Sequence, residues 1–109
     1  MDLELTQQSC VPCEGGVDPL RGERLSEYSQ LIHEDWSIVD EHHLVREFRF
    51  QDFREALMFT NKVGEIAEDE GHHPDIFLSY GKAVVTLWTH AIDGISENDF
   101  ILAAKIDHI

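Results

Sequence analysis

The sequence has few basic residues, and this shortage excludes several classes of ligand. Lys and Arg number 8 against 22 Asp and Glu, so the 109-residue chain has a formal net charge of −14. Proteins that bind nucleic acids need a basic surface that displaces counterions from phosphates, and the chain has no run of basic residues. We therefore expect no direct binding of nucleic acid, and we expect anionic membranes and polyphosphate ligands to be disfavoured.

Long apolar runs are missing as well. No stretch approaches the ~20 apolar residues that a transmembrane helix requires. The first residues, MDLELTQQ, have neither the basic nor the apolar region of a signal peptide. The length and the composition, 42% hydrophobic and 28% charged, are those of one small globular domain. We expect a cytoplasmic protein with no membrane contact, in which a leader over residues 1–20 precedes a single domain over residues 21–109.

Cysteine is scarce, with Cys10 and Cys13 in C-V-P-C as the only two. One C-x-x-C motif supplies half of the four ligands that a structural zinc ion needs, and the chain has no second motif. Redox motifs of this kind usually lie at the start of a helix, whereas this one lies in a leader that proline and glycine predict to be loop-like. We expect a structural or incidental role for the cysteines. The alternative is a metal site shared between subunits.

Apolar periodicity predicts helices over residues 21–33, 53–69 and 97–106, and strands over residues 37–40, 43–50 and on both sides of Gly81. The long central helix has an N-cap at Asp52 and a stop at Gly71. Its apolar stripe is expected to comprise Phe53, Ala56, Leu57, Val63, Ile66 and Ala67. Gly64, inside this helix, is expected where the helix approaches the sheet closely.

The order of elements is helix, two strands, helix, two strands, helix. This order predicts an α+β fold, a four-stranded antiparallel sheet with about three helices packed on one face. The other face, or an exposed strand edge, would then need a cover. We expect a homo-oligomer, a homodimer or a homotetramer, to supply it.

The stretch from Glu68 to His90 contains three of the seven histidines. Alternating residues on both sides of Gly81 predict a hairpin centred on that glycine. Such a hairpin would bring His90 about level with His72, and cross-strand neighbours lie only ~5 Å apart. Because Pro74 cannot donate to a strand ladder, it marks the start of the strand and leaves His72 and His73 on the entry loop.

Histidines grouped in this way suit a reaction that removes one proton and delivers another, since imidazole titrates near neutrality. The remaining histidines are expected to be surface residues or satisfied core residues. They are His33, His42, His43 and His108.

Several motifs together resemble those of the pterin-4a-carbinolamine dehydratase family, and the resemblance covers nearly the whole chain. They are E-x-x-x-H-H-P from Glu68 to Pro74, Tyr80, Thr89–His90, G-I-S-x-x-D from Gly94 to Asp99, Trp36, and F-x-D-F from Phe50 to Phe53. The leader, C-x-x-C-x-G-G, is similar to that of bacterial members. Asn98 departs from the arginine of the animal proteins.

The resemblance implies dehydration of a 4a-hydroxytetrahydropterin to quinonoid dihydropterin and water, without a metal or other cofactor. It implies a link to an aromatic amino-acid hydroxylase such as phenylalanine hydroxylase, whose tetrahydropterin would be recycled. His72 and His90 would protonate the hydroxyl group from opposite faces of the pterin, and His73 would hold and polarise the ring. The implied substrate-binding residues are Glu68, Pro74, Trp36 and Asp99. Asp99 either belongs to the site or only caps the last helix.

Two other functions stay open at this point. Three histidines can hold a catalytic zinc ion, so His72, His73 and His90 could belong to a metal-dependent hydrolase, although the side chains of adjacent residues tend to diverge. The other function is that of a non-enzymatic partner module, since animal members of the family also serve as dimerisation cofactors of a homeodomain transcription factor.

Overall fold

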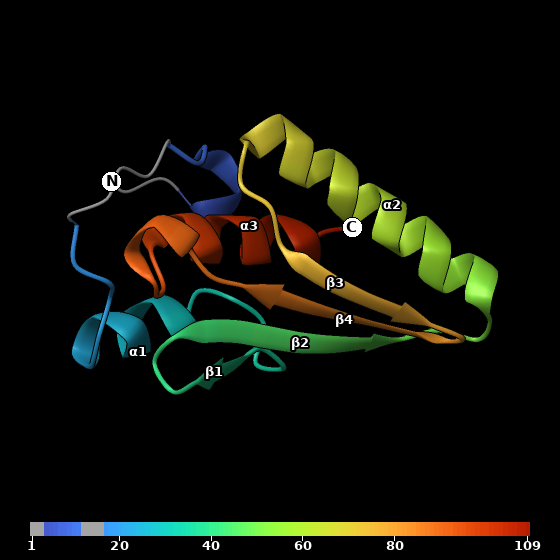
Figure 1. The fold of residues 1–109 in the computed structure, drawn as a ribbon, viewed down its shortest axis with the longest axis horizontal. Coiled ribbons are helices and arrows are strands. Elements are labelled where there is room, and N and C mark those ends of the chain that lie inside the picture. Colours follow the sequence, from blue (N-terminus) through green and yellow to red (C-terminus); the bar gives the residue numbers. More distant parts are fainter. Residues whose placement is uncertain (1–3, 12–16) are drawn as a thin grey trace.

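The computed structural model describes residues 4–11 and 17–109, which form a four-stranded antiparallel sheet and the helices that pack on it (Figure 1). The order of strands across the sheet is β1-β2-β4-β3. The strands are β1 Ser37–Val39, β2 His43–Arg49, β3 Asp75–Ser79 and β4 Lys82–Leu87. The helices are α1 Glu23–Ser29, α2 Phe53–Glu70 and α3 Glu97–Asp107, with short 3-10 helices η1 Leu5–Gln7 and η2 His90–Ile92. The expected α+β fold is confirmed.

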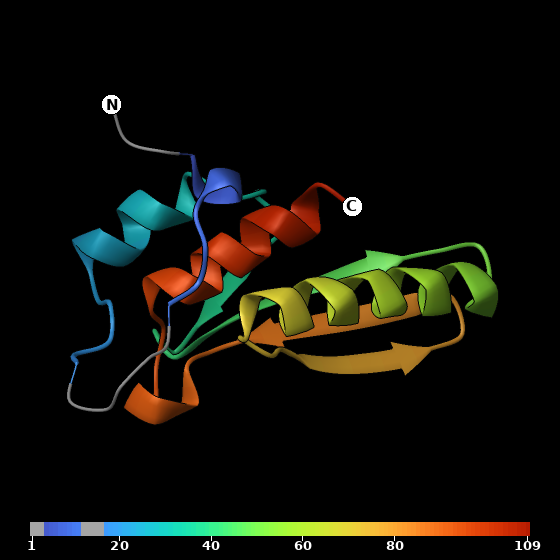
Figure 2. The ribbon, with the colours of Figure 1, turned by 90° about the horizontal axis from the view of Figure 1, so that it is seen from above.

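One face of the sheet is covered and the other is open. Figure 2 shows α2 and α3 lying across the same face, and α1 packs beside α3. Every second residue of β4, namely Ala83, Val85 and Leu87, is fully buried beneath these helices. Leu44 of β2 lies opposite Leu87 and is fully buried too. Within the described part of the chain, no helix is both long and apolar enough to cross a membrane.

The hairpin between β3 and β4 has a two-residue turn, Tyr80–Gly81, because Ser79 pairs with Lys82. Gly81 has a φ of 70°, a left-handed conformation that glycine adopts without strain. The centre of the hairpin therefore lies between Tyr80 and Gly81, not on Gly81. Extending the register past the ends of the strands places Thr89, not His90, level with His72. The expected alignment was wrong by one residue.

Both ends of α2 form as its sequence predicts. The Asp52 side chain accepts a hydrogen bond from the Glu55 amide at 2.8 Å, and Gly71 ends the helix in the left-handed conformation. The expected apolar stripe was only partly right. Phe53 and Leu57 are 43% and 39% exposed, whereas Phe59 is buried against the sheet.

A glycine inside α2 was expected to mark a close approach to the sheet. A Cβ atom added to Gly64 would meet no other atom within 4 Å, so that expectation was wrong.

Helix α3 is buried on nearly all sides and forms the centre of the molecule. The buried set includes Phe100, Ala103 and Ala104. At the C-terminal end of α3, the Asp107 carboxylate accepts hydrogen bonds from Arg46 and from the indole of Trp36, both at 2.7 Å. Arg46 thus lies on the covered face of β2 without leaving its charge unpaired.

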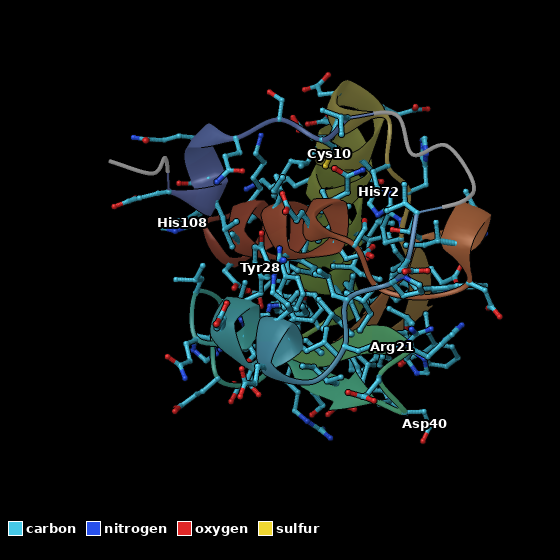
Figure 3. The ribbon with its side chains drawn as sticks, turned by 90° about the vertical axis from the view of Figure 1, so that its left-hand side faces the viewer. Cys10, Arg21, Tyr28, Asp40, His72 and His108 are labelled. Carbon is cyan, nitrogen blue, oxygen red and sulfur yellow. The ribbon has the colours of Figure 1, made fainter. Side chains whose placement is uncertain are left out.

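The described part of the leader packs on α3 and on the end of α2. Leu5 is buried in the core. Cys10 donates its backbone N–H to Glu70 at 2.8 Å, and both backbone groups of Val11 bind the side chain of Asn98, at 3.0 and 2.6 Å. Figure 3 shows Cys10 and His72 on the same side of the molecule, near the end of α2. The leader is therefore attached close to the histidine motif.

Burial and the nearby Glu70 charge raise the pKa of the Cys10 thiol from 9.0 to about 12. The thiol stays protonated and lies 3.6 Å from the Asn98 carbonyl oxygen. These contacts agree with a structural role for Cys10, and Cys13 lies outside the described residues. Burial also raises the pKa of Glu70, but hydrogen bonds from Cys10 and Lys105 outweigh it, and the pKa is lowered from its usual 4.5.

We expect the substitution Glu70→Gln to destabilise the protein by about 1–3 kcal/mol at pH 7, because it removes charge-assisted hydrogen bonds to the leader and to Lys105. A carboxyl with a lowered folded-state pKa stabilises the fold above its usual value of 4.5. That contribution is lost as the pH falls through the folded-state pKa. Urea denaturation should therefore show that the difference in free energy of unfolding between Glu70→Gln and the wild type becomes smaller below pH 4.5.

The exposed Glu65→Gln on the same helix is the matched control and should change stability little. A pH-independent difference for Glu70→Gln would contradict the role assigned to its charge.

Candidate active site

The fully buried carboxylate of Asp99 is the centre of a hydrogen-bond network. Its Oδ2 atom accepts hydrogen bonds from the Ser96 amide at 2.9 Å and the Thr89 hydroxyl at 2.8 Å. Its Oδ1 atom lies 2.6 Å from Nε2 of His72. An ionised carboxylate can only accept hydrogen bonds, so Nε2 of His72 carries the proton. Asp99 thus caps α3 and also fixes the orientation of an imidazole.

The backbone brings His72 to this carboxylate directly after α2 ends. Its amide donates to the Ala67 carbonyl oxygen at 3.2 Å as part of the helix cap, and its side chain is only 12% exposed. Since Asp99 takes up Nε2, the nitrogen left for chemistry is Nδ1. A carboxylate in this position fixes the orientation of the imidazole and sets its tautomer.

His73 has a different environment from its neighbour. Its Nε2 lies 3.1 Å from the Glu68 carboxylate, and the two side chains are 60% and 78% exposed. An exposed pair of this kind contributes about 0–1 kcal/mol. Both side chains can therefore reach a ligand at little cost in stability.

His90 begins the turn that follows β4. Thr89 and Gly94 close this turn through two backbone hydrogen bonds, of 2.7 and 3.4 Å. Because the Thr89 side chain binds Asp99, His90 lies one residue from the same network. Its own ring is exposed, and the ring centroids of His90 and Trp88 lie 3.9 Å apart with their planes tilted by 33°.

Besides Glu68, which pairs with His73, two more of the expected substrate-binding residues lie outside the Asp99 network. Pro74 directly precedes β3, as predicted, and is half-buried. Trp36 is 7% exposed, and its indole N–H is satisfied by Asp107. Asp107 lies about two helical turns from Asp99, roughly 12 Å along α3. The structure therefore does not bring Trp36 together with the histidines, and we leave it out of the site.

Sequence reasoning missed the contact between the Thr89 hydroxyl and Asp99. Thr89 and Ser96 are 2.7 Å apart through their oxygens, and both contact Asp99. Alternation along β4 was an available signal, because it places Thr89 on the same side as Leu87, toward the helices. The aromatic contact between Trp88 and His42 was missed as well.

A large hollow of the described surface lies elsewhere. It is an open groove of about 1390 Å³ between η1, α1 and the end of α3, and His33 and His108 line it. None of the three motif histidines belongs to this lining. We place the candidate site at the histidines because that is where a buried carboxylate orients a titratable group. Across the described residues, no three His, Cys, Asp or Glu side chains are gathered to hold a metal ion.

Known proteins share both the sequence and the fold. The family model for "Pterin 4 alpha carbinolamine dehydratase" matches residues 18–109. A protein of Rubrobacter xylanophilus, provisionally named a pterin-4-alpha-carbinolamine dehydratase, is 54% identical over 97% of this chain and 98% of its own. One from Alkaliphilus metalliredigens with the same provisional name is 50% identical over 94% and 93%.

A solved structure shares the fold at lower sequence identity. The "transcriptional coactivator/pterin dehydratase" of Brucella melitensis matches with a TM-score of 0.77 and 32% identity, over 84% of this chain and 97% of its own.

The substitution Asp99→Asn should lower the free energy of unfolding by about 1–3 kcal/mol, because an amide cannot accept from all three donors around this buried position. Urea denaturation at neutral pH measures the change. The exposed Asp69→Asn, at the end of α2, is the control and should differ from the wild type by no more than about 0.5 kcal/mol. Equal stability of Asp99→Asn and the wild type would contradict the network.

Proposed function

The chain belongs to the pterin-4a-carbinolamine dehydratase family and is a hydro-lyase. We propose that it dehydrates 4a-hydroxytetrahydropterin and that histidine side chains act as the general acids and bases. The observation that carries this proposal is the 2.6 Å contact between His72 and the buried Asp99 carboxylate. Such a pair holds in a fixed orientation a side chain that can act as an acid or a base.

The reaction needs two proton movements. Hydroxide is a poor leaving group at C4a, so the hydroxyl oxygen takes a proton as the C4a–O bond breaks. The N5–H proton is lost to a base, and the electron pair of that bond forms the C4a=N5 double bond of quinonoid dihydropterin. The products are this dihydropterin and one water molecule. General acid–base catalysis of such steps typically contributes ~10²–10⁴-fold.

We assign the acid on one face of the pterin to His72. Its Nε2 atom is held by Asp99, so the proton would be delivered from Nδ1. The second acid, toward the opposite face, is His90, whose ring is exposed. His73 and Glu68, both exposed, would bind the ring and its N–H groups, and Pro74 would line the entry.

The wider role is the recycling of tetrahydropterin for an aromatic amino-acid hydroxylase, with phenylalanine hydroxylase as the proposed partner. The expected homodimer or homotetramer stays a prediction. It is supported by the open sheet face, where Phe77 is 61% exposed. The mass of the protein in solution would test it. The metal-dependent alternative finds no support, since His72 and His73 are directed at different carboxylates.

The proposed division of labour predicts stereochemical selectivity. His72→Ala should lower kcat for one 4a-hydroxy isomer by ~10²-fold or more and affect the other far less, and His90→Ala should show the opposite preference. His73→Ala should mainly raise KM, because it removes binding that is equal in the ground and transition states. Stopped-flow measurement of kcat and KM for each isomer tests this.

His108→Ala, at the exposed end of α3, is the matched control and should leave both isomers unchanged. Similar losses for both isomers in all three variants would rule out divided labour. Undetectable dehydration by the wild type would overturn the function itself.

A further inference from the structure

An aromatic cluster beside His90 has no part in the chemistry described so far. The rings of Trp88 and His90 lie 3.9 Å apart with an angle of 33° between their planes. Trp88 faces the open side of the sheet, because its neighbours Leu87 and Thr89 face the helices. The indole thus packs against the imidazole, and His90 stays exposed.

His42, from the turn between β1 and β2, extends the cluster. Its ring lies 4.6 Å from that of Trp88, and its Nε2 atom lies 2.8 Å from the Asp93 carboxylate. Asp93 directly follows η2, the short helix that begins at His90. The β1–β2 turn therefore contacts the η2 turn on both sides of His90, through Trp88 before it and Asp93 after it.

The contact with Trp88 is the ring contact that His90 makes in the described part of the chain. Among the described residues, no group forms a hydrogen bond with either nitrogen of its ring, whereas His72 and His73 each have a carboxylate partner. An exposed side chain without such a partner samples several rotamers. A stacked aromatic pair favours one arrangement by between about twofold and about tenfold.

We propose that Trp88 is a positioning residue for His90, and that His42 and Asp93 brace Trp88 and the η2 turn. The proposal rests on the proposed role of His90 as an acid. Trp88 acts through the imidazole and not on the substrate. Its removal should therefore affect only the isomer that His90 serves, whereas a tryptophan needed only for packing would affect both isomers alike.

The test compares Trp88→Ala with the conservative Trp88→Phe. We expect Trp88→Ala to lower kcat between about twofold and about tenfold for the isomer that His90→Ala impairs, with KM and the other isomer little changed. Trp88→Phe should restore most of the loss, since it keeps an aromatic ring. Phe77→Ala, which removes an exposed aromatic ring from the same sheet face, is the matched control and should leave the isomer ratio unchanged.

A second measurement needs no substrate. Protons stacked on an indole resonate upfield, so the imidazole protons of His90 should move downfield in the NMR spectrum of Trp88→Ala. If Trp88→Ala does not fold, His42→Ala should move the His90 imidazole resonances downfield by a smaller amount. Equal losses for both isomers, or unmoved His90 resonances, would overturn the proposal. A His90→Ala variant that slows both isomers alike would instead overturn the proposed role of His90 as the acid for one isomer, whatever the resonances show.

Discussion

The buried carboxylate of Asp99 is the constraint on which the rest of the structure depends. A buried carboxylate is tolerated only when hydrogen-bond donors contact its oxygen atoms. Here the donors come from three separate places: the first turn of α3, Thr89 after β4, and His72 after α2. The last helix, the end of the sheet and the histidine motif therefore hold one another in place. The tertiary fold, and not a local motif, orients His72.

The same helix explains how the rest of the chain is attached to the site. Asn98, next to Asp99, binds the leader, and Asp107 at the other end binds Arg46 of β2. Between these polar ends, α3 is apolar and buried. His90 is oriented in another way, through aromatic contacts on the open face of the sheet. The two histidines proposed as acids are therefore held by different kinds of contact.

Features that depend on residues close together in the sequence could be predicted from it. Caps, periodicity and the order of elements predicted the helices, the sheet and the hairpin, because each signal is local. The register was wrong by one residue, since alternation alone does not say whether a turn is centred on Gly81 or beside it. Trp36 belongs to the motif pattern, but its partner Asp107 is 71 positions away. The contact between His42 and Trp88 likewise joins separate elements, and periodicity carries no information about it.

The central claim is that Asp99 holds a proton on Nε2 of His72. Long-range ¹H–¹⁵N NMR of the wild-type imidazoles, with the Asp99→Asn spectrum for assignment, tests it most directly. The account predicts a downfield, slowly exchanging Nε2 proton for His72 and rapid exchange for the exposed His73 and His90. A His72 ring whose proton exchanges as fast as theirs, or lies on Nδ1 in the neutral form, would contradict it.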